Sequence, residues 1–336
     1  MMEARLYLKE KEKKVRCQAC NHRCLIKEGQ RGICWVRENR GGILYSLVYG
    51  RPIATHVDPI EKKPLFHFLP GSTSFSLATV GCNFRCLFCQ NADISQAREM
   101  KRIAGEEVAV EEIIAAALRA KCRSISYTYT EPTVFFEYAQ DIASLASERG
   151  LKNVFVTNGY MTSEVLDSLH PNLHAANVDL KAFREDFYKT QCGAKLAPVL
   201  ASLKMMKRLG VWVEVTTLII PTLNDSKEEL GELAQFVADE LGPETPWHIS
   251  RFHPTYKATQ LPITSVKTLQ QAWEIGKEAG LRYVYTGNVP GNPGEKTYCH
   301  RCGYLLLDRF GFSILKNNLQ NGNCPQCRTA LDGIGL

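Results

Sequence analysis

The sequence predicts an α/β fold in which a parallel β-sheet is built from repeated strand–helix units. Two observations lead to this prediction. About seven short apolar segments between residues 75 and 287 alternate with segments of helical periodicity, which is the signature of βαβ units. The lengths and apolar interiors of these strands suit a barrel or partial barrel, whose functional groups lie at the C-terminal ends of the strands.

The individual elements follow from apolar runs and from a repeat of about 3.6 residues. Strands are expected at residues 75–80, 124–130, 153–159, 175–182, 211–220, 247–252 and 282–287. Helices are expected at residues 108–121, 134–150, 163–170, 184–190, 196–210, 226–242 and 265–280. Ser163 is expected to cap one helix and Gly150 to end another.

The chain divides into three predicted parts. Residues 1–70 hold a cysteine-rich segment and a connector, residues 71–290 form the α/β core, and residues 291–336 form a small tail. Within the first part, residues 50–73 are rich in Pro and Gly and are therefore predicted to be an extended connector with turns.

The composition is that of a soluble globular protein, with 45% hydrophobic and 23% charged residues. The charged N-terminus does not resemble a signal peptide, and no apolar run is long enough to cross a bilayer. We therefore expect a cytoplasmic protein. The formal charge is +6, but there is no long basic run with interleaved aromatic residues, so nucleic acid is not an expected partner.

Thirteen cysteines are many for a compartment in which thiols stay reduced. Eleven of them fall into three groups, which are Cys17, Cys20, Cys24 and Cys34; Cys82, Cys86 and Cys89; and Cys299, Cys302, Cys324 and Cys327. Close C-x2-C pairs suit metal binding, because the ligands of a metal must converge on one point. The two remaining cysteines, Cys122 and Cys192, stand alone.

The middle group has the spacing C-x3-C-x2-C and follows the first predicted strand. A [4Fe–4S] cluster has four irons, so three cysteine ligands leave one iron open for a substrate or cofactor. A zinc ion completed by water or by a distant residue is the alternative. The cluster is favoured because the motif opens the βα series and carries Phe88 before its last cysteine.

The two flanking groups each offer four thiolates. The C-terminal group reads C-x2-C, 21 residues, C-x2-C around a predicted hairpin at 303–317, which is the spacing of a zinc ribbon. The N-terminal group fits either a structural zinc or an auxiliary iron–sulfur cluster, and its spacing does not separate them. A zinc staple suits so short a segment, and with four cysteines nearby His22 is not an expected ligand.

Unusual polar residues follow the predicted strands, where the rim of the sheet is expected. Any one of them could simply cap the next helix, but together with the cysteine motif they predict one functional rim. These residues are Thr130, Glu131, Asn158, Asp179, Lys181, Arg251, His253 and Asn288.

The segment GCNFRCLFCQN resembles the signature of the radical S-adenosylmethionine (SAM) superfamily, C-x3-C-x-φ-C with an aromatic residue at φ. The resemblance extends over residues 75–290 and implies a partial (β/α)6 barrel. It also implies that SAM binds the open iron of a [4Fe–4S] cluster on Cys82, Cys86 and Cys89. Reductive cleavage of SAM then gives a 5′-deoxyadenosyl radical that abstracts a hydrogen atom from a substrate.

The same resemblance implies roles for individual residues in the SAM pocket. YTYTEPT resembles the family's GGEP pattern, with Glu131 and Pro132 at matching positions and Tyr129 and Thr130 in the places of the two glycines. VTNGY, VDLKA and SRFHP resemble segments of glycyl-radical activating enzymes, and Phe88 is expected beside the adenine. The expected cofactor-binding residues are Phe88, Thr130, Glu131, Thr157, Asn158, Asp179, Lys181 and His253.

Across nearly all 336 residues, the cysteine segments together with YTYTEPTVFFEYA and NVDLKAFREDFYKTQCGAKLAPVL resemble radical SAM enzymes of the AmmeMemoRadiSam system. This resemblance implies AMMECR1-like and Memo-like protein partners, and an electron donor such as flavodoxin or ferredoxin, but it does not identify the substrate. Cys192 lies in a loop on the predicted catalytic side, so it is a candidate reactive thiol, although a buried packing role is the alternative.

Three other functions remain open at this stage. A glycyl-radical activating enzyme would suit the TNG and D-x-K segments. An RNA-modifying radical SAM enzyme would suit the combination of core and ribbon. A non-catalytic interaction module would hold zinc at all three cysteine groups, and it would lack the iron of a cluster.

Overall fold

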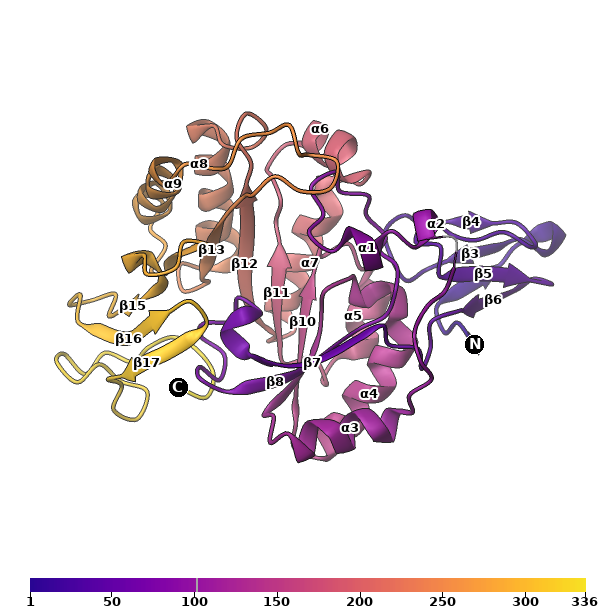
Figure 1. Cartoon of the computed structure of the whole chain (residues 1–336), viewed down its shortest axis with the longest axis horizontal. Helices are drawn as coiled ribbons and strands as arrows, with labels where there is room; N and C mark the ends of the chain where they lie inside the picture. The colour runs from indigo at the N-terminus through magenta and orange to yellow at the C-terminus, as the bar shows by residue number, and fades with distance from the viewer. Residues whose placement is uncertain (101) are drawn as a thin grey trace.

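The computed structural model describes residues 1–100 and 102–336, and its centre is a sheet whose strands follow the order β14-β13-β12-β11-β10-β9-β8-β7 (Figure 1). The strands of this sheet are β7 (Ala54–Pro59), β8 (Thr73–Ala78), β9 (Ser124–Tyr127), β10 (Lys152–Thr157), β11 (Ala175–Asp179), β12 (Trp212–Ile219), β13 (Trp247–Arg251) and β14 (Val284–Gly287). Neighbouring strands from β8 to β14 run parallel, whereas β7 runs antiparallel to β8.

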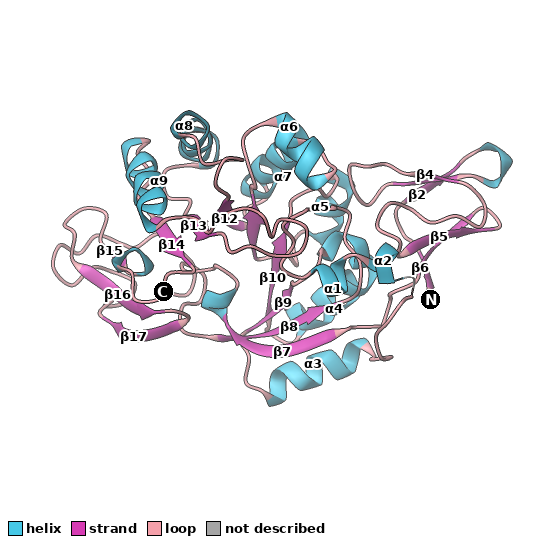
Figure 2. Ribbon diagram, turned by 45° about the horizontal axis from the view of Figure 1, so that its top comes forward, coloured by secondary structure: helices cyan, strands magenta, loops and turns pink. Residues whose placement is uncertain are grey.

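Helices connect these parallel strands and form an arc around the sheet (Figure 2). They are α3 (Val110–Arg119), α4 (Phe136–Glu148), α5 (Ser163–Leu169), α6 (Glu185–Phe187), α7 (Leu196–Arg208), α8 (Lys227–Phe236) and α9 (Val266–Glu278). Short helical turns precede or extend them: α1 (Ala92–Ser95), α2 (Ala97–Met100), η3 (Pro132–Phe135), η4 (Tyr188–Cys192) and η5 (Val237–Leu241). The predicted α/β fold with a central parallel sheet is therefore confirmed.

The ends of the central sheet explain why it is a partial barrel. In the part of the chain that the structure describes, β14 and β7 form the two edges and do not pair with each other. The family resemblance implied six parallel strands, whereas the sheet carries a seventh, β14, as the apolar run at 282–287 predicted.

The predicted connector at 50–73 is wrong in part, because it contains a strand of the central sheet. Strand β7 pairs with β8 from Ala54 opposite Ala78 to Pro59 opposite Thr73. Its Pro lies at the strand end on the sheet edge, where a missing N–H group costs little. Since β7 is an edge strand whose residues are mostly exposed and whose one buried residue is Asp58, it lacks the apolar run that marks the buried strands.

One predicted helix cap is also displaced. The cap of α5 is Thr162, whose hydroxyl accepts a hydrogen bond from the Val165 N–H at 3.4 Å. Thr162 has extended backbone angles, whereas Ser163 already lies within the helix and its hydroxyl contacts Glu164 instead. Adjacent Thr and Ser are both good caps, so the sequence alone does not separate them.

The two cysteine-rich flanks lie at opposite ends of the long axis of the molecule (Figure 1). The N-terminal flank contains β1 (Met2–Glu3), β2 (Tyr7–Lys9), β3 (Val15–Cys17), β4 (Leu25–Ile26), β5 (Arg37–Arg40) and β6 (Ile43–Ser46). The C-terminal flank is an antiparallel sheet of β15 (Thr297–Tyr298), β16 (Leu305–Phe310) and β17 (Ser313–Asn317).

A buried chain of hydrogen bonds joins the C-terminal flank to the core. Arg309 donates to Thr297 at 2.6 Å, the Thr297 and Tyr285 hydroxyls lie 2.8 Å apart, and Tyr285 lies 2.6 Å from Nε2 of His67. Nδ1 of His67 lies 2.6 Å from the carbonyl oxygen of Asp332, which can only accept, so Nδ1 carries the proton. Burial lowers the pKa of His67 to about 4, which keeps this tautomer neutral.

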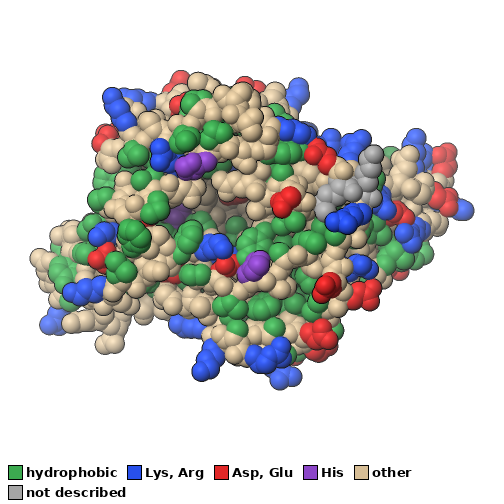
Figure 3. All heavy atoms as spheres, viewed as in Figure 1, with side chains coloured by type: hydrophobic (Ala, Val, Ile, Leu, Met, Phe, Trp, Pro, Cys, Tyr) green, Lys and Arg blue, Asp and Glu red, His purple; other side chains and the backbone are tan. Residues whose placement is uncertain are grey.

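Among residues 1–100 and 102–336, no helix is both long and apolar enough to span a bilayer. Basic and acidic side chains are interspersed on the face shown in Figure 3 rather than gathered in a basic stripe.

Candidate cofactor site

The candidate site begins in the loop that follows β8 at the C-terminal edge of the sheet. Gly81 has φ +100°, and a Cβ atom there would lie 2.6 Å from Cγ1 of Val36 and 3.1 Å from the carbonyl oxygen of Cys34. Only glycine fits this conformation and this close approach. The loop can therefore turn tightly against the N-terminal flank and present Cys82, Cys86 and Cys89 on one side.

Two of these three cysteines have an N–H or hydroxyl group as a hydrogen-bonding partner at their sulfur atom. The Phe84 N–H donates to Sγ of Cys82 at 3.3 Å, and the Ser95 hydroxyl lies 3.2 Å from Sγ of Cys89. Such contacts stabilise thiolates. Burial raises the pKa of Cys82 and of Cys89 because it disfavours the charged thiolates, and a bound metal would offset that cost.

The three cysteines open onto one cavity of about 400 Å3 at the C-terminal ends of the parallel strands. Each strand from β9 to β13, or the loop after it, contributes to the wall. The lining includes Phe88, Thr130, Glu131, Thr157, Asn158, Asp179 and Lys181, together with Ser250, Asn288 and Phe312. The structure thus brings together the sequence-predicted residues from five separate segments.

Glu131 is the most connected polar group in this wall. Its carboxylate accepts from the Thr133 N–H at 3.1 Å, the Thr157 hydroxyl at 2.8 Å and the Asn158 N–H at 2.8 Å. It is 1% exposed, and burial raises its pKa. Glu131 therefore both begins η3 and fixes the end of β10, while its carboxylate remains at the cavity wall.

Asp179 and Lys181 form a second polar pair in the wall. Nζ of Lys181 lies 2.8 Å from Oδ2 of Asp179 and 5.9 Å from the centre of the Phe88 ring. Burial opposes the charge on Lys181, but Asp179 and Cys86 outweigh it and raise the pKa of the amine. A fixed positive charge thus lies between the cysteine loop and the end of β11.

The donor set fits a [4Fe–4S] cluster. Three sulfur ligands come from one loop, backbone and hydroxyl donors lie near them, and a cavity lies beside them for a ligand on the open iron.

Comparison with known proteins agrees with a cluster at this site. Residues 76–237 match the radical SAM superfamily, and an uncharacterized protein of Methanocaldococcus jannaschii is 49% identical over 334 residues, or 99% of each chain. The chain belongs to the radical SAM superfamily.

Two further similarities place this radical SAM protein among its relatives. The pyruvate formate-lyase-activating enzyme of Clostridium pasteurianum is 30% identical over 164 residues, which cover 47% of this chain and 66% of that protein. A radical SAM methyltransferase from Sphaerobacter thermophilus has a TM-score of 0.52 and 20% identity, covering 68% of this chain and 71% of the other. The second similarity concerns the fold alone.

Tyr129, which the family resemblance aligns with a glycine, has a strained backbone conformation. Tyr129 has φ +63°, a left-handed conformation that costs a side-chain-bearing residue about 1–2 kcal/mol. Its hydroxyl donates to Asp58, Nζ of Lys63 lies 4.5 Å from its ring centre, and Asn91 donates to its carbonyl oxygen at 2.8 Å. These contacts stabilise the left-handed backbone conformation of Tyr129, which glycine adopts more readily.

Two expected site residues lie elsewhere. His253 is exposed in the loop after β13 and does not line the described cavity, where Ser250 and Asn288 occupy the corresponding wall. Cys192 is fully buried behind the cysteine loop, and its thiol is hydrogen-bonded to Cys86, which lowers the pKa of Cys86. The η4 turn thus supports the loop: the Arg85 N–H donates to the Cys192 carbonyl oxygen at 2.8 Å.

The sequence reasoning missed several residues of the wall. Lys62 and Lys63 line the cavity, and both pair with Asp58, at 2.9 and 2.6 Å. They follow β7, within the segment 50–73 whose Pro and Gly content predicts a connector. The signal that could have found them is the pair of lysines beside an acidic residue in DPIEKKP, but it does not differ from a solvated charged turn.

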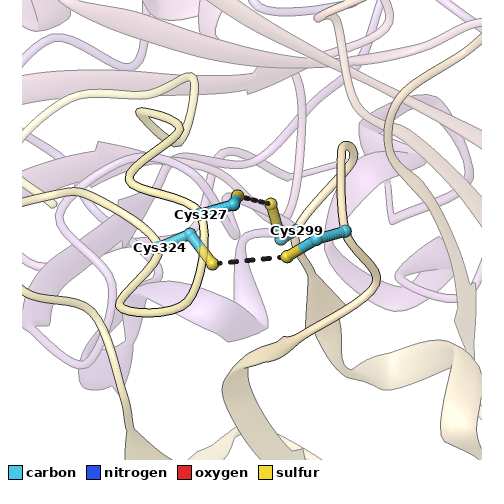
Figure 4. A group of neighbouring side chains, drawn as sticks. Cys299, Cys324 and Cys327 are labelled. Carbon is cyan, nitrogen blue, oxygen red and sulfur yellow. Dashed lines mark hydrogen bonds between the residues drawn. The ribbon is translucent and has the colours of Figure 1, made fainter.

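The C-terminal cysteines gather tightly enough for a single metal ion. Sγ of Cys299 lies 3.5 Å from Sγ of Cys327, and Sγ of Cys302 lies 3.6 Å from Sγ of Cys324 (Figure 4). The ligand atoms of all four lie within 4.8 Å of one another. Tetrahedral zinc with bonds of about 2.3 Å places its sulfurs about 3.8 Å apart, so a single ion fits.

Proposed function

We propose that this chain is an enzyme that binds a [4Fe–4S] cluster through Cys82, Cys86 and Cys89 and binds SAM in the adjoining cavity. The observation that carries the proposal is three convergent cysteines at the rim of a parallel sheet, next to a 400 Å3 cavity lined by polar residues from five strands. When bound, the cluster and SAM supply a 5′-deoxyadenosyl radical that removes a hydrogen atom from a substrate.

Different residues of the cavity wall are suited to bind different parts of SAM. Glu131 lines the cavity and its carboxylate accepts from Asn158, so it is suited to accept a hydrogen bond from the amino group of SAM. The Lys181 amine is suited to the carboxylate of the methionine part, and Asp179 orients that amine. Phe88 offers an apolar face for the adenine, and Thr157 and Asn158 hold the end of β10 in place.

The test is anaerobic incubation of the full chain with SAM and dithionite. We expect 5′-deoxyadenosine from the wild-type protein and none from the variant with Cys82, Cys86 and Cys89 all changed to Ala. Cys122→Ala is the matched control, because Cys122 is buried just before the start of β9, whereas the cysteine loop follows the end of the parallel strand β8, and it should retain the activity. Cleavage that survives in the triple variant would refute the proposal.

At a finer level, we propose membership of the AmmeMemoRadiSam system, on the resemblance of the cysteine segments and the motifs YTYTEPTVFFEYA and NVDLKAFREDFYKTQCGAKLAPVL. This proposal includes AMMECR1-like and Memo-like partners and a flavodoxin or ferredoxin as electron donor. Purified partners should co-elute with the chain in size-exclusion chromatography. The absence of any complex at micromolar concentrations would contradict the partner proposal without affecting SAM cleavage.

Activation of a glycyl-radical enzyme is the second candidate, because one similar protein is the pyruvate formate-lyase-activating enzyme of Clostridium pasteurianum. In that case the hydrogen atom would come from a glycine of a partner protein. A glycyl-radical signal in the partner, dependent on SAM, would select this function. A mass shift in a small metabolite would instead indicate that the enzyme acts on a small molecule.

A further inference from the structure

The four cysteines of the N-terminal flank surround one small cavity. Cys17 ends β3, Cys20 and Cys24 lie between β3 and β4, and Cys34 precedes β5. All four line the cavity, together with His22, Arg37 and residues of η3 in the core. The group is therefore closed in by the α/β core rather than lying at the surface of the flank.

The sulfur atoms of this group are less tightly gathered than those of the tail. Within the described residues, the tail cysteines gather their four ligand atoms within 4.8 Å of one another, whereas no three of these N-terminal cysteines do so. The same holds for Cys82, Cys86 and Cys89, the ligands proposed for a cluster. A single zinc would need sulfurs about 3.8 Å apart, but a cubic cluster carries one thiolate on each of four irons and so spreads them.

A buried donor also lacks an acceptor at this cavity. Arg37 is 2% exposed, and its two terminal nitrogens donate to Glu137 at 2.8 and 2.7 Å. Its Nε has no hydrogen-bond partner. An unpaired buried N–H group costs about 1–3 kcal/mol, so an acceptor on a bound group is expected, and sulfide or thiolate sulfur is such an acceptor.

From these two observations, we infer that Cys17, Cys20, Cys24 and Cys34 hold a second iron–sulfur cluster of the [4Fe–4S] type. The site lies against the first one. His22 Nε2 lies 2.8 Å from the carbonyl oxygen of Asn83 in the cysteine loop, and Cys34 and Cys82 line a common cavity of about 450 Å3. This inference goes beyond the proposed function and does not require SAM cleavage.

The deciding experiment counts metals in the full chain, purified without oxygen and reconstituted with iron and sulfide. In the variant with Cys82, Cys86 and Cys89 changed to Ala, we expect about four irons and four sulfides per chain to remain. Adding Cys20→Ala and Cys34→Ala to that variant should remove this iron and leave the metal of the tail. Cys122→Ala should match the wild type.

Two results would overturn the inference. One is a triple variant that holds no iron but about two zinc ions per chain, one at each flank. The other is a triple variant that holds no iron and only the tail metal. Should the triple variant fail to fold, the wild-type count decides: about eight irons per chain support a second cluster and about four exclude it.

Discussion

The two cysteine-rich flanks offer the same four thiolates but differ in how they hold them. In the tail, pairs of sulfur atoms lie 3.5 and 3.6 Å apart, and Cys302 is exposed to solvent. In the N-terminal flank, the four cysteines surround a cavity that is also lined by η3 and by Arg37, which pairs with the buried Glu137. The number of candidate ligands can be counted in the sequence, whereas the distances between their sulfur atoms depend on how the surrounding chain packs.

The largest expected effect comes from removing metal from the tail. Changing Cys324 and Cys327 to Ala should release its metal and unfold residues 291–336, because binding of a structural metal in so small a unit is worth about 10 kcal/mol or more. Limited proteolysis and metal analysis would detect both changes. SAM cleavage should persist, and its complete loss would mean that the tail closes the active site.

A smaller but still severe effect is expected from breaking the buried ion pair beside the N-terminal cysteines. Glu137→Ala leaves the Arg37 charge unpaired in the core, which should destabilise the chain by about 3–5 kcal/mol in urea unfolding. The matched change in the tail is Asp308→Ala, which breaks a partly exposed pair with Lys296 and should cost less than about 1 kcal/mol. Equal losses of stability in the two variants would contradict the proposed difference between the two flanks.

Glu131→Gln should weaken SAM binding by about ten- to a hundredfold, since a charge-assisted hydrogen bond is worth about 1.5–3 kcal/mol. It should also lower stability by about 1–3 kcal/mol, because the amide nitrogen of Gln would face the Thr157 or Asn158 donors. Anaerobic equilibrium binding and urea unfolding measure the two effects. Unchanged SAM affinity would remove Glu131 from the pocket.

The smallest effect concerns pH and the attachment of the tail. The pKa of His67 is lowered to about 4 from about 6.5, so the neutral form is required and its stability contribution is complete above pH 6.5. As pH falls from 7 to 6, the folded chain should lose about 0.7 kcal/mol from this residue. His67→Asn should abolish that part of the pH dependence, and an unchanged slope would contradict the assignment.

Much of the fold and of the cysteine loop could be predicted from the sequence, because buried parallel strands leave apolar runs and ligand spacing is local. The strand ends then placed Glu131, Asn158, Asp179 and Lys181 at one rim, and the cavity lining agrees. The contacts between segments that lie far apart in the sequence could not be predicted. The edge strand β7 has no apolar run, so Lys62 and Lys63 were missed.

Tyr129 shows a second reason why part of the site could not be predicted from the sequence. The glycine-like backbone at this position depends on Asp58 and Lys63, which lie about seventy residues earlier and reach it through the β7–β8 pairing. His253 shows the opposite case, because a motif match alone nominated a residue that the loop after β13 leaves exposed. Local patterns indicate chemistry, but tertiary contacts decide which residue supplies it.

The central claim is that three cysteines leave one iron open for SAM, and electron paramagnetic resonance of the reduced protein tests it most directly. Adding SAM to the reduced, anaerobic wild-type chain should change the cluster signal, because a ligand on the open iron alters its electronic environment. The variant lacking Cys82, Cys86 and Cys89 should show no such change. A wild-type spectrum that is identical with and without saturating SAM would contradict the account.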